Sequence, residues 1–149
     1  MQRVPIIVME RSGQWAAALR RELSSETARL IETRTLDECW RRLAEWPKGF
    51  AAIELTEERI EPLLAGLRQM ERRFPKARAI VLASRALSPC ADLLREAGAV
   101  HFVSSVRSLG PVAELVRRRA SQMATASELS AGGDDLLAEV LADLPWSDE

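Results

Sequence analysis

The strongest constraint on the fold is a repeated alternation of strand-length apolar segments with amphipathic helical segments. Such apolar runs occur five times in the first 122 residues, and a helical pattern follows each of them. Short apolar runs of this kind are typical of strands buried on both faces, and the helices between them supply right-handed crossovers between parallel neighbours. The sequence therefore predicts an α/β domain with a doubly wound, five-stranded parallel sheet. The predicted strands are 4–9, 28–33, 50–55, 77–83 and 99–103.

Start and stop signals place a helix after each predicted strand. Ser12 is predicted to cap the first helix, and the Thr35-x-x-Glu38 pattern indicates a capping box at the start of the second. Proline is tolerated in a first helical turn, and glycine commonly ends a helix. The remaining boundaries are indicated by Pro62, Ser88-Pro89, Gly98 and Gly110-Pro111.

Length and composition favour one domain. The chain has 149 residues, of which 47% are hydrophobic and 29% are charged, which suffices for a single well-filled core. No apolar run approaches the roughly 18 residues needed to cross a bilayer, so we expect a cytoplasmic protein without a membrane segment. The two cysteines, Cys39 and Cys90, fall inside helical patterns without metal-ligand spacing, and we expect small core side chains rather than a disulfide.

The last 27 residues differ in charge from the rest of the chain. Residues 123–149 hold seven acidic side chains and no Lys or Arg, whereas the other 122 residues hold 21 basic and 15 acidic side chains. We expect a domain over 1–122, a flexible linker over 123–135 and an acidic amphipathic tail over 136–149. The tail is predicted either to lie against a basic body or to be presented to a protein partner. Its expected interaction residues are Leu137, Leu141, Leu144 and Trp146.

Five strand–helix units of this length, with an acid ending the third strand and a "GAVHFVSSV" segment around the fifth, resemble the receiver domain of bacterial response regulators. The resemblance covers about residues 3–122. It implies a phospho-acceptor aspartate after strand three, an acidic pair that binds Mg²⁺ after strand one, a hydroxyl after strand four and a lysine after strand five. The spacing suits the family, because Glu10 and Glu54 are 44 residues apart and Ser105 follows Glu54 by 51.

The matching positions carry altered chemistry. The acidic pair falls on Met9 and Glu10, so one Mg²⁺ ligand has become a thioether. The phospho-acceptor position falls on Glu54, whose longer side chain displaces the carboxylate from the geometry of in-line transfer. The hydroxyl, aromatic-switch and lysine positions fall on Ala83, Phe102 and Ser105, and Ser84 is a misplaced hydroxyl. The resemblance thus implies a degenerate receiver, or pseudo-receiver.

We therefore expect a non-catalytic interaction module in bacterial signalling, without cofactor or metal. Glu54 then has three interpretations: the remnant of a phospho-acceptor, a structural carboxylate that caps its loop or pairs with an arginine, or a permanent mimic of the phosphorylated state. The alternative function is a working phospho-receiver or a metal-dependent phosphoryl or hydrolytic enzyme that uses Glu10 and Glu54.

Other signals point to surface or core roles. His101 is the only histidine and has no second ligand at metal spacing, and a single glycine follows the first strand, so neither a metal nor a nucleotide site is expected. The arginine pairs lack a helix-turn-helix or stacking aromatics, so nucleic-acid binding is not expected. A homodimer is predicted through the face made by helix four, strand five and helix five. That face is expected to offer Leu87, Val106, Leu109 and Val112.

Overall fold

The computed structural model describes the backbone of residues 3–142 and the side chains of residues 3–126. Five strands form one sheet, and each strand is followed by helical structure. The strands are β1 (Val4–Met9), β2 (Ala28–Thr33), β3 (Phe50–Glu54), β4 (Arg78–Leu82) and β5 (Ala99–Val103). The helices are α1 (Gln14–Glu22), α2 (Leu36–Glu45), α3 (Ile60–Arg73), α4 (Ala91–Glu96) and α5 (Gly110–Ala142), with short 3₁₀ segments η1 (Glu57–Arg59) and η2 (Arg85–Cys90).

The sheet is parallel throughout, with strand order β2-β1-β3-β4-β5. In its centre Ile7 of β1 lies between Ile31 of β2 and Ala51 of β3. The order reverses direction at β1, where β2 lies on one side and β3 on the other. In a doubly wound sheet such a reversal places a crevice at the carboxyl ends of the strands. The predicted fold class is confirmed.

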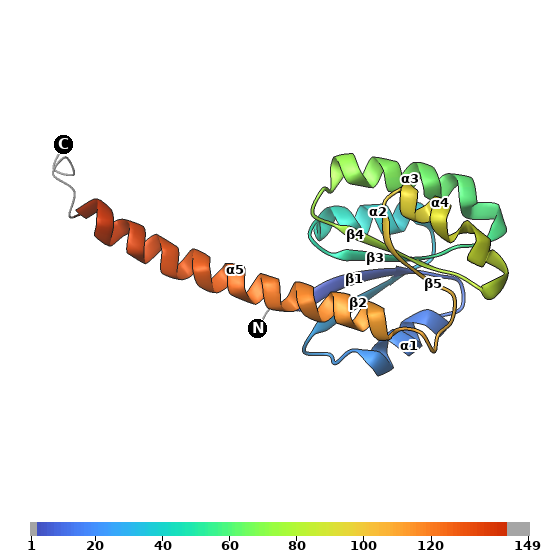
Figure 1. Cartoon of the computed structure of the whole chain (residues 1–149), viewed down its shortest axis with the longest axis horizontal. Coiled ribbons are helices and arrows are strands. Elements are labelled where there is room, and N and C mark those ends of the chain that lie inside the picture. The colour runs from blue at the N-terminus through green and yellow to red at the C-terminus, as the bar shows by residue number, and fades with distance from the viewer. Residues whose placement is uncertain (1–2, 143–149) are drawn as a thin grey trace.

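Helices cover both faces of the sheet (Figure 1). Helices α1 and α5 pack on one face, where Val4, Ile6 and Val8 of β1 meet Leu19 and Val112. Helices α2, α3 and α4 pack on the other face, over a cluster that includes Ile7 and Met9 of the same strand. Successive β1 side chains point to opposite faces, and both sets are buried because both faces are covered.

Helix α2 starts as the sequence predicted. The Thr35 side chain accepts a hydrogen bond from Glu38 N at 3.1 Å, and the Glu38 carboxylate accepts one from Arg34 N at 3.3 Å. In a standard capping box the glutamate carboxylate accepts a hydrogen bond from the backbone N–H of the capping residue, which here would be Thr35. In this chain the donor is Arg34, one residue earlier. The apolar face of α2 buries Cys39 and Leu43 completely.

Helix α4 starts later than predicted. The Ser88-Pro89 pair lies inside η2, and regular α-helix begins only at Ala91. Proline has no N–H to donate, and the tighter turns of a 3₁₀ segment accommodate it without an α-helical bond at that position. The predicted stop is confirmed, because Gly98 has φ +124°, a conformation that favours glycine.

Helix α5 extends through the residues for which a linker was predicted. It runs without a break from Gly110 to Ala142, 33 residues, and leaves the domain as a long projection (Figure 1). Ala, Met, Glu and Leu are strong helix formers and dominate residues 123–131, which accounts for the continuation. The division into domain, linker and tail stays a prediction. The side chains of Leu137 and Leu141 lie outside the described part of the chain, and Leu144 and Trp146 lie outside it entirely.

Two further expectations can be compared with the structure. Among the described residues, no helix combines the length and hydrophobicity that a membrane crossing requires. Leu109 and Val112, which were expected on the dimer face, are fully buried, and Leu87 is buried in the cluster on the α2–α4 face, so that expectation was wrong for these three residues. The apolar side of α5 faces its own domain because the sheet needs covering there.

The two cysteines differ in environment, which gives a testable contrast. Cys39 is fully buried in the core, and burial raises the pKa of its thiol to about 12, with Glu38 adding to the shift. Cys90 is only half-buried at the margin of the same cluster. We expect Cys90→Ala to leave a native protein that does not react with a thiol reagent at pH 8. Cys39→Ala should keep one reactive thiol, and urea should expose both in the parent; fast native labelling of Cys39 would contradict the packing.

Candidate functional site

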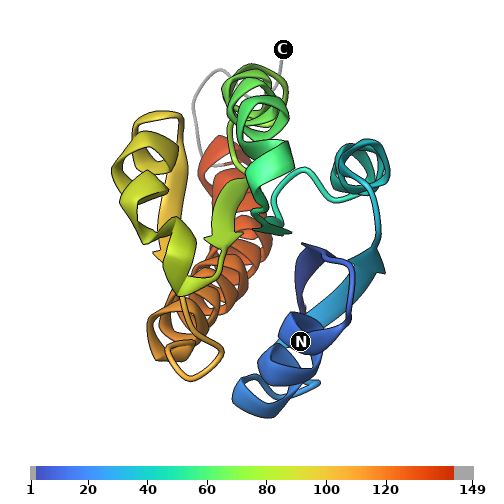
Figure 2. The same ribbon diagram turned by 90° about the vertical axis from the view of Figure 1, so that its right-hand side faces the viewer.

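A hollow of about 520 Å³ lies at the carboxyl ends of β3, β4 and β5, next to the start of α1. Figure 2 looks onto this end of the domain, with α5 running away behind it. The loops that follow the three strands form most of the lining. The lining residues are Gln14, Trp15, Glu54, Leu55, Thr56, Glu57, Ala83, Ser84, Ala86, Leu87, Ser104, Ser105 and Val106.

Four of the predicted site residues meet in this hollow. Glu54, Ala83, Ser84 and Ser105 come from three different strand ends and line the same space. Parallel strands bring their carboxyl ends to one edge, so residues far apart in the sequence converge there. Met9, Glu10 and Phe102 do not line it.

Glu54 is the last residue of β3 and is half-buried. Its Oε1 accepts a hydrogen bond from the backbone N–H of Arg11 at 3.4 Å, which links the end of β3 to the loop after β1. The Arg11 side chain turns instead to Glu58, at 3.6 Å, and both groups are exposed. Within residues 3–126, no arginine or lysine forms an ion pair with Glu54.

Glu10 does not line the hollow. It is fully buried, and its two carboxylate oxygens accept hydrogen bonds from Trp15 N at 2.8 Å and Ala16 N at 2.6 Å. These N–H groups belong to the first turn of α1 and have no partner within the helix. A carboxylate at this place also interacts favourably with the positive end of the helix dipole. Glu10 is therefore the N-terminal cap of α1.

This arrangement corrects the predicted cap of α1. Gly13, with φ +84°, occupies the N-cap position and has no side chain to offer, and Ser12 accepts only a 3.3 Å bond from Gln14 N. The loop is held from the other side by Arg34, whose Nη1 donates to the carbonyls of Glu10 and Arg11 at 3.0 and 3.1 Å. The first turn of α1 thus depends on a residue outside the helix.

Met9 lies in the core and is fully buried. The guanidinium of Arg59 approaches it, with Arg59 Nη1 at 3.3 Å from the Met9 sulfur. A thioether is a weak hydrogen-bond acceptor, and the contact places a permanent cation beside the position that a Mg²⁺ ligand would take in a receiver. No pattern in the sequence points to Arg59, because its approach depends on the turn made by η1.

The residues present do not fit a Mg²⁺ ion. Mg²⁺ prefers several hard oxygen ligands in octahedral geometry. Here Met9 offers sulfur, both Glu10 oxygens are engaged by α1, and Arg59 brings positive charge. Among the residues whose side chains are described, no three His, Cys, Asp or Glu groups converge in a way that could hold a metal ion.

The strand-four and strand-five positions also lack receiver chemistry. Ala83 is buried, and its N–H donates to Val103 O at 2.8 Å, a continuation of the β4–β5 ladder. Ser84 is exposed, and its side chain makes no cap for η2. Ser105 is half-buried, and its Oγ accepts from Arg107 N at 3.2 Å, so it stabilises a local turn.

The charge of the hollow opposes an anionic ligand. Its lining includes two carboxylates, Glu54 and Glu57, and neither Lys nor Arg. A phosphoryl group brings about two further negative charges at neutral pH. Without a cation in the lining, these charges would repel, so the hollow lacks the electrostatic stabilisation on which phosphoryl transfer depends.

Two residues of β5 lie away from the hollow. Phe102, from the predicted set, is buried in the cluster on the α2–α4 face. Its neighbour His101 is half-buried, and burial and the nearby Arg95 lower the pKa of its imidazole. Neither side chain lines the hollow.

Comparison with known proteins places the fold. No family model and no curated protein sequence matches this chain. Among solved structures, it is similar to a response regulator from Thermotoga maritima, with a TM-score of 0.68 and 18% identity over 80% of this chain and 99% of that one. A CheY-like protein, tadZ, from Pseudomonas aeruginosa gives a TM-score of 0.63 and 13% identity over 78% and 94% of the two chains.

A third similar structure is that of an atypical orphan response regulator, described as having a phosphorylation-independent regulatory mechanism. Its TM-score is 0.62, with 12% identity over 77% of this chain and 96% of that one. All three likenesses rest on backbone architecture, since the identities are 18% or lower. The chain has the fold of response regulator receiver domains.

Proposed function

We propose that this chain is a pseudo-receiver, a non-catalytic protein interaction module in signalling that is not phosphorylated by the aspartyl route. The observation that carries the proposal is the commitment of Glu10 to the N-terminus of α1, 2.8 and 2.6 Å from two backbone nitrogens. The acidic lining of the hollow and the Arg59–Met9 contact support it. The atypical orphan regulator described as phosphorylation-independent is a precedent on the same fold.

The test is incubation with Mg²⁺ and acetyl phosphate, followed by intact-mass measurement. We expect no phosphoryl adduct, because the ligand set does not suit Mg²⁺ and the hollow has no cation. Beryllofluoride with Mg²⁺ should leave the fluorescence of Trp15, which lines the hollow, unchanged. A Trp15→Phe variant identifies the Trp15 signal among the four tryptophans. A phospho-accepting receiver in the same buffer serves as positive control, and an adduct that disappears in Glu54→Ala would refute the proposal.

We also propose that the α4–β5 side of the domain binds a protein. Leu93 of α4 and Val100 of β5 are the exposed large hydrophobics among the residues with described side chains, at 44% and 42% exposure. They replace Leu109 and Val112 as the apolar residues available on the face for which a homodimer was predicted. Exposed apolar side chains near charged ones, here Arg95, are typical of modest protein interfaces.

A single substitution tests this face. Leu93→Glu replaces an exposed apolar side chain on this side of the domain with a charged one and should remove proteins that the parent captures from the native host, because desolvating the carboxylate is unfavourable. Arg68→Glu, on the exposed side of α3, is the control and should capture the same proteins as the parent. Equal capture by the parent and Leu93→Glu would show that this face is not used.

A further inference from the structure

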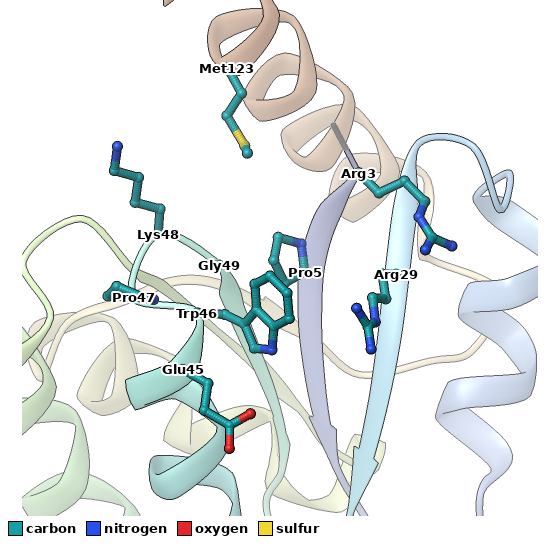
Figure 3. A pocket seen from close by; sticks show the side chains of 9 residues that line it. All are labelled: Arg3, Pro5, Arg29, Glu45, Trp46, Pro47, Lys48, Gly49 and Met123. Carbon is teal, nitrogen blue, oxygen red and sulfur yellow. The ribbon is translucent and has the colours of Figure 1, made fainter. Parts of the chain in front are cut away.

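A second pocket lies at the opposite edge of the sheet from the hollow, near the amino ends of β1 and β2. It has a volume of about 540 Å³. Trp46 and Pro5 lie at its centre in Figure 3, with Arg3 and Arg29 to one side, Lys48 to the other and Met123 of α5 above. The remaining lining residues are Glu45, Pro47 and Gly49.

The pocket combines positive charge with apolar surface. Arg3, Arg29 and Lys48 are exposed, and within residues 3–126 no carboxylate forms an ion pair with any of them. Glu45, the acid of the lining, is engaged by Arg42 at 2.9 Å. The Arg29 guanidinium carbon lies 5.2 Å from the centroid of the Trp46 ring, so one cation already stacks on the aromatic surface.

We propose that this pocket binds residues 143–149 of a second copy of the chain. The segment has the sequence DLPWSDE, with three acids, no base, and Leu144, Pro145 and Trp146 between them. Its acids match the three cations of the pocket, and its central apolar residues match Pro5, Trp46 and Met123. Charge complementarity of this kind selects a partner, and a buried aromatic anchor supplies much of the affinity.

Residues 143–149 come from a second copy because they follow the end of α5, too far away to reach the pocket of their own chain. Met123 is at the pocket, and Ala142 lies 19 positions further along α5. At 1.5 Å per residue this helix carries Ala142 about 28 Å away. Trp146 lies four residues further on, which spans at most about 14 Å when extended. Even if the chain turned straight back after Ala142, Trp146 would fall about 14 Å short of the pocket of its own copy.

Antiparallel pairing of the α5 helices of two copies would bring residues 143–149 of each copy to the pocket of the other. If the stretch from Met123 to Ala142 lies alongside its copy in the opposite direction, Ala142 of one chain is level with Met123 of the other, and the segment enters the partner's pocket. The midpoint of that stretch falls between Gly132 and Gly133, where the absence of side chains lets two backbones approach closely. The arrangement is two-fold symmetric, with two equivalent docking contacts.

Sedimentation velocity of the full chain tests the inference. We expect a monomer–dimer equilibrium that weakens by about tenfold or more in Arg29→Glu and in Trp146→Ala, because each removes a central contact. Lys48→Glu is a second pocket variant in case Arg29→Glu disturbs β2. Arg68→Glu reverses an exposed charge away from the pocket and should leave the dimer unchanged. Circular dichroism of each variant checks that the domain is folded.

A mixing experiment separates docking between copies from docking within one. Arg29→Glu retains the segment, and Trp146→Ala retains the pocket, so an equimolar mixture should form a heterodimer with one intact contact. Neither variant alone should dimerise at the same concentration. Added salt should weaken the heterodimer by screening the charged part, while the apolar part persists.

Three outcomes would overturn the inference. They are a parent that is monomeric at every concentration, a dimer that survives both Arg29→Glu and Trp146→Ala, and variants that lose the dimer without restoring it on mixing. A dimer lost in Leu93→Glu but kept in Arg29→Glu would assign self-association to the α4–β5 side instead. None of these results depends on phosphorylation, so failure of the docking inference is distinct from failure of the pseudo-receiver proposal.

Discussion

Glu10→Ala is expected to lower the free energy of unfolding by about 3 kcal/mol, an estimate based on two buried N–H groups left without an acceptor. Trp15 N and Ala16 N lie 2.8 and 2.6 Å from the Glu10 oxygens, and the Glu10 side chain is fully buried. For a domain of this length, the loss corresponds to a fall in melting temperature of about 6–12 °C. Urea denaturation followed by circular dichroism measures it.

Matched variants distinguish a cap from a metal ligand. Glu10→Gln keeps one acceptor oxygen and should lose less stability than Glu10→Ala, because one N–H stays paired. Glu26→Ala removes an exposed carboxylate after α1 and should change stability by less than about 0.5 kcal/mol. Mg²⁺ should not stabilise the parent. A Glu10→Ala variant as stable as Glu26→Ala, or a parent stabilised by millimolar Mg²⁺ only when Glu10 is present, would contradict the capping role.

The fold was predictable because its signals are local and repeated. Each strand is a short apolar run, and that of 4–9 is buried at every position, a pattern that is legible without tertiary information. The Thr35 cap is also local, since its acceptor and donor are three residues apart. Rules of handedness and connection restrict such an alternation to a few strand orders, and the structure shows that this chain adopts β2-β1-β3-β4-β5.

The site was less predictable because its chemistry depends on contacts between distant segments. The sequence pattern suggests a metal-ligand remnant at Glu10. In the structure Gly13 gives α1 no side-chain cap, and the Glu10 carboxylate instead accepts hydrogen bonds from the first turn of the helix. The Arg59–Met9 contact joins residues 50 positions apart. The surface position expected for Leu109 was wrong because this residue precedes α5 and packs with Ile80 and Leu82 of β4, a contact between distant segments that a local pattern does not show.

Close packing between α2 and α3 gives a second large effect on stability. Gly66 of α3 is buried, and a Cβ added there would lie 2.5 Å from Cζ2 of the Trp40 ring and 3.1 Å from Cε2. Real Cβ contacts are not this short, so an alanine requires the indole or the helix to move. We expect Gly66→Ala to destabilise the domain by about 2 kcal/mol, the usual scale for overpacking a core.

The same substitution should change sign once the indole is removed. In a Trp40→Leu background the ring that opposes the new methyl group is absent, and alanine is favoured over glycine inside a helix by about 1 kcal/mol. Gly66→Ala should therefore stabilise Trp40→Leu, although Trp40→Leu alone is less stable than the parent. Urea denaturation of the parent, both single variants and the double variant forms a cycle whose coupling energy measures the clash. A coupling energy near zero would mean that α3 and α2 do not meet at Gly66 and Trp40, and the close approach of the indole would then no longer explain a glycine in the middle of α3.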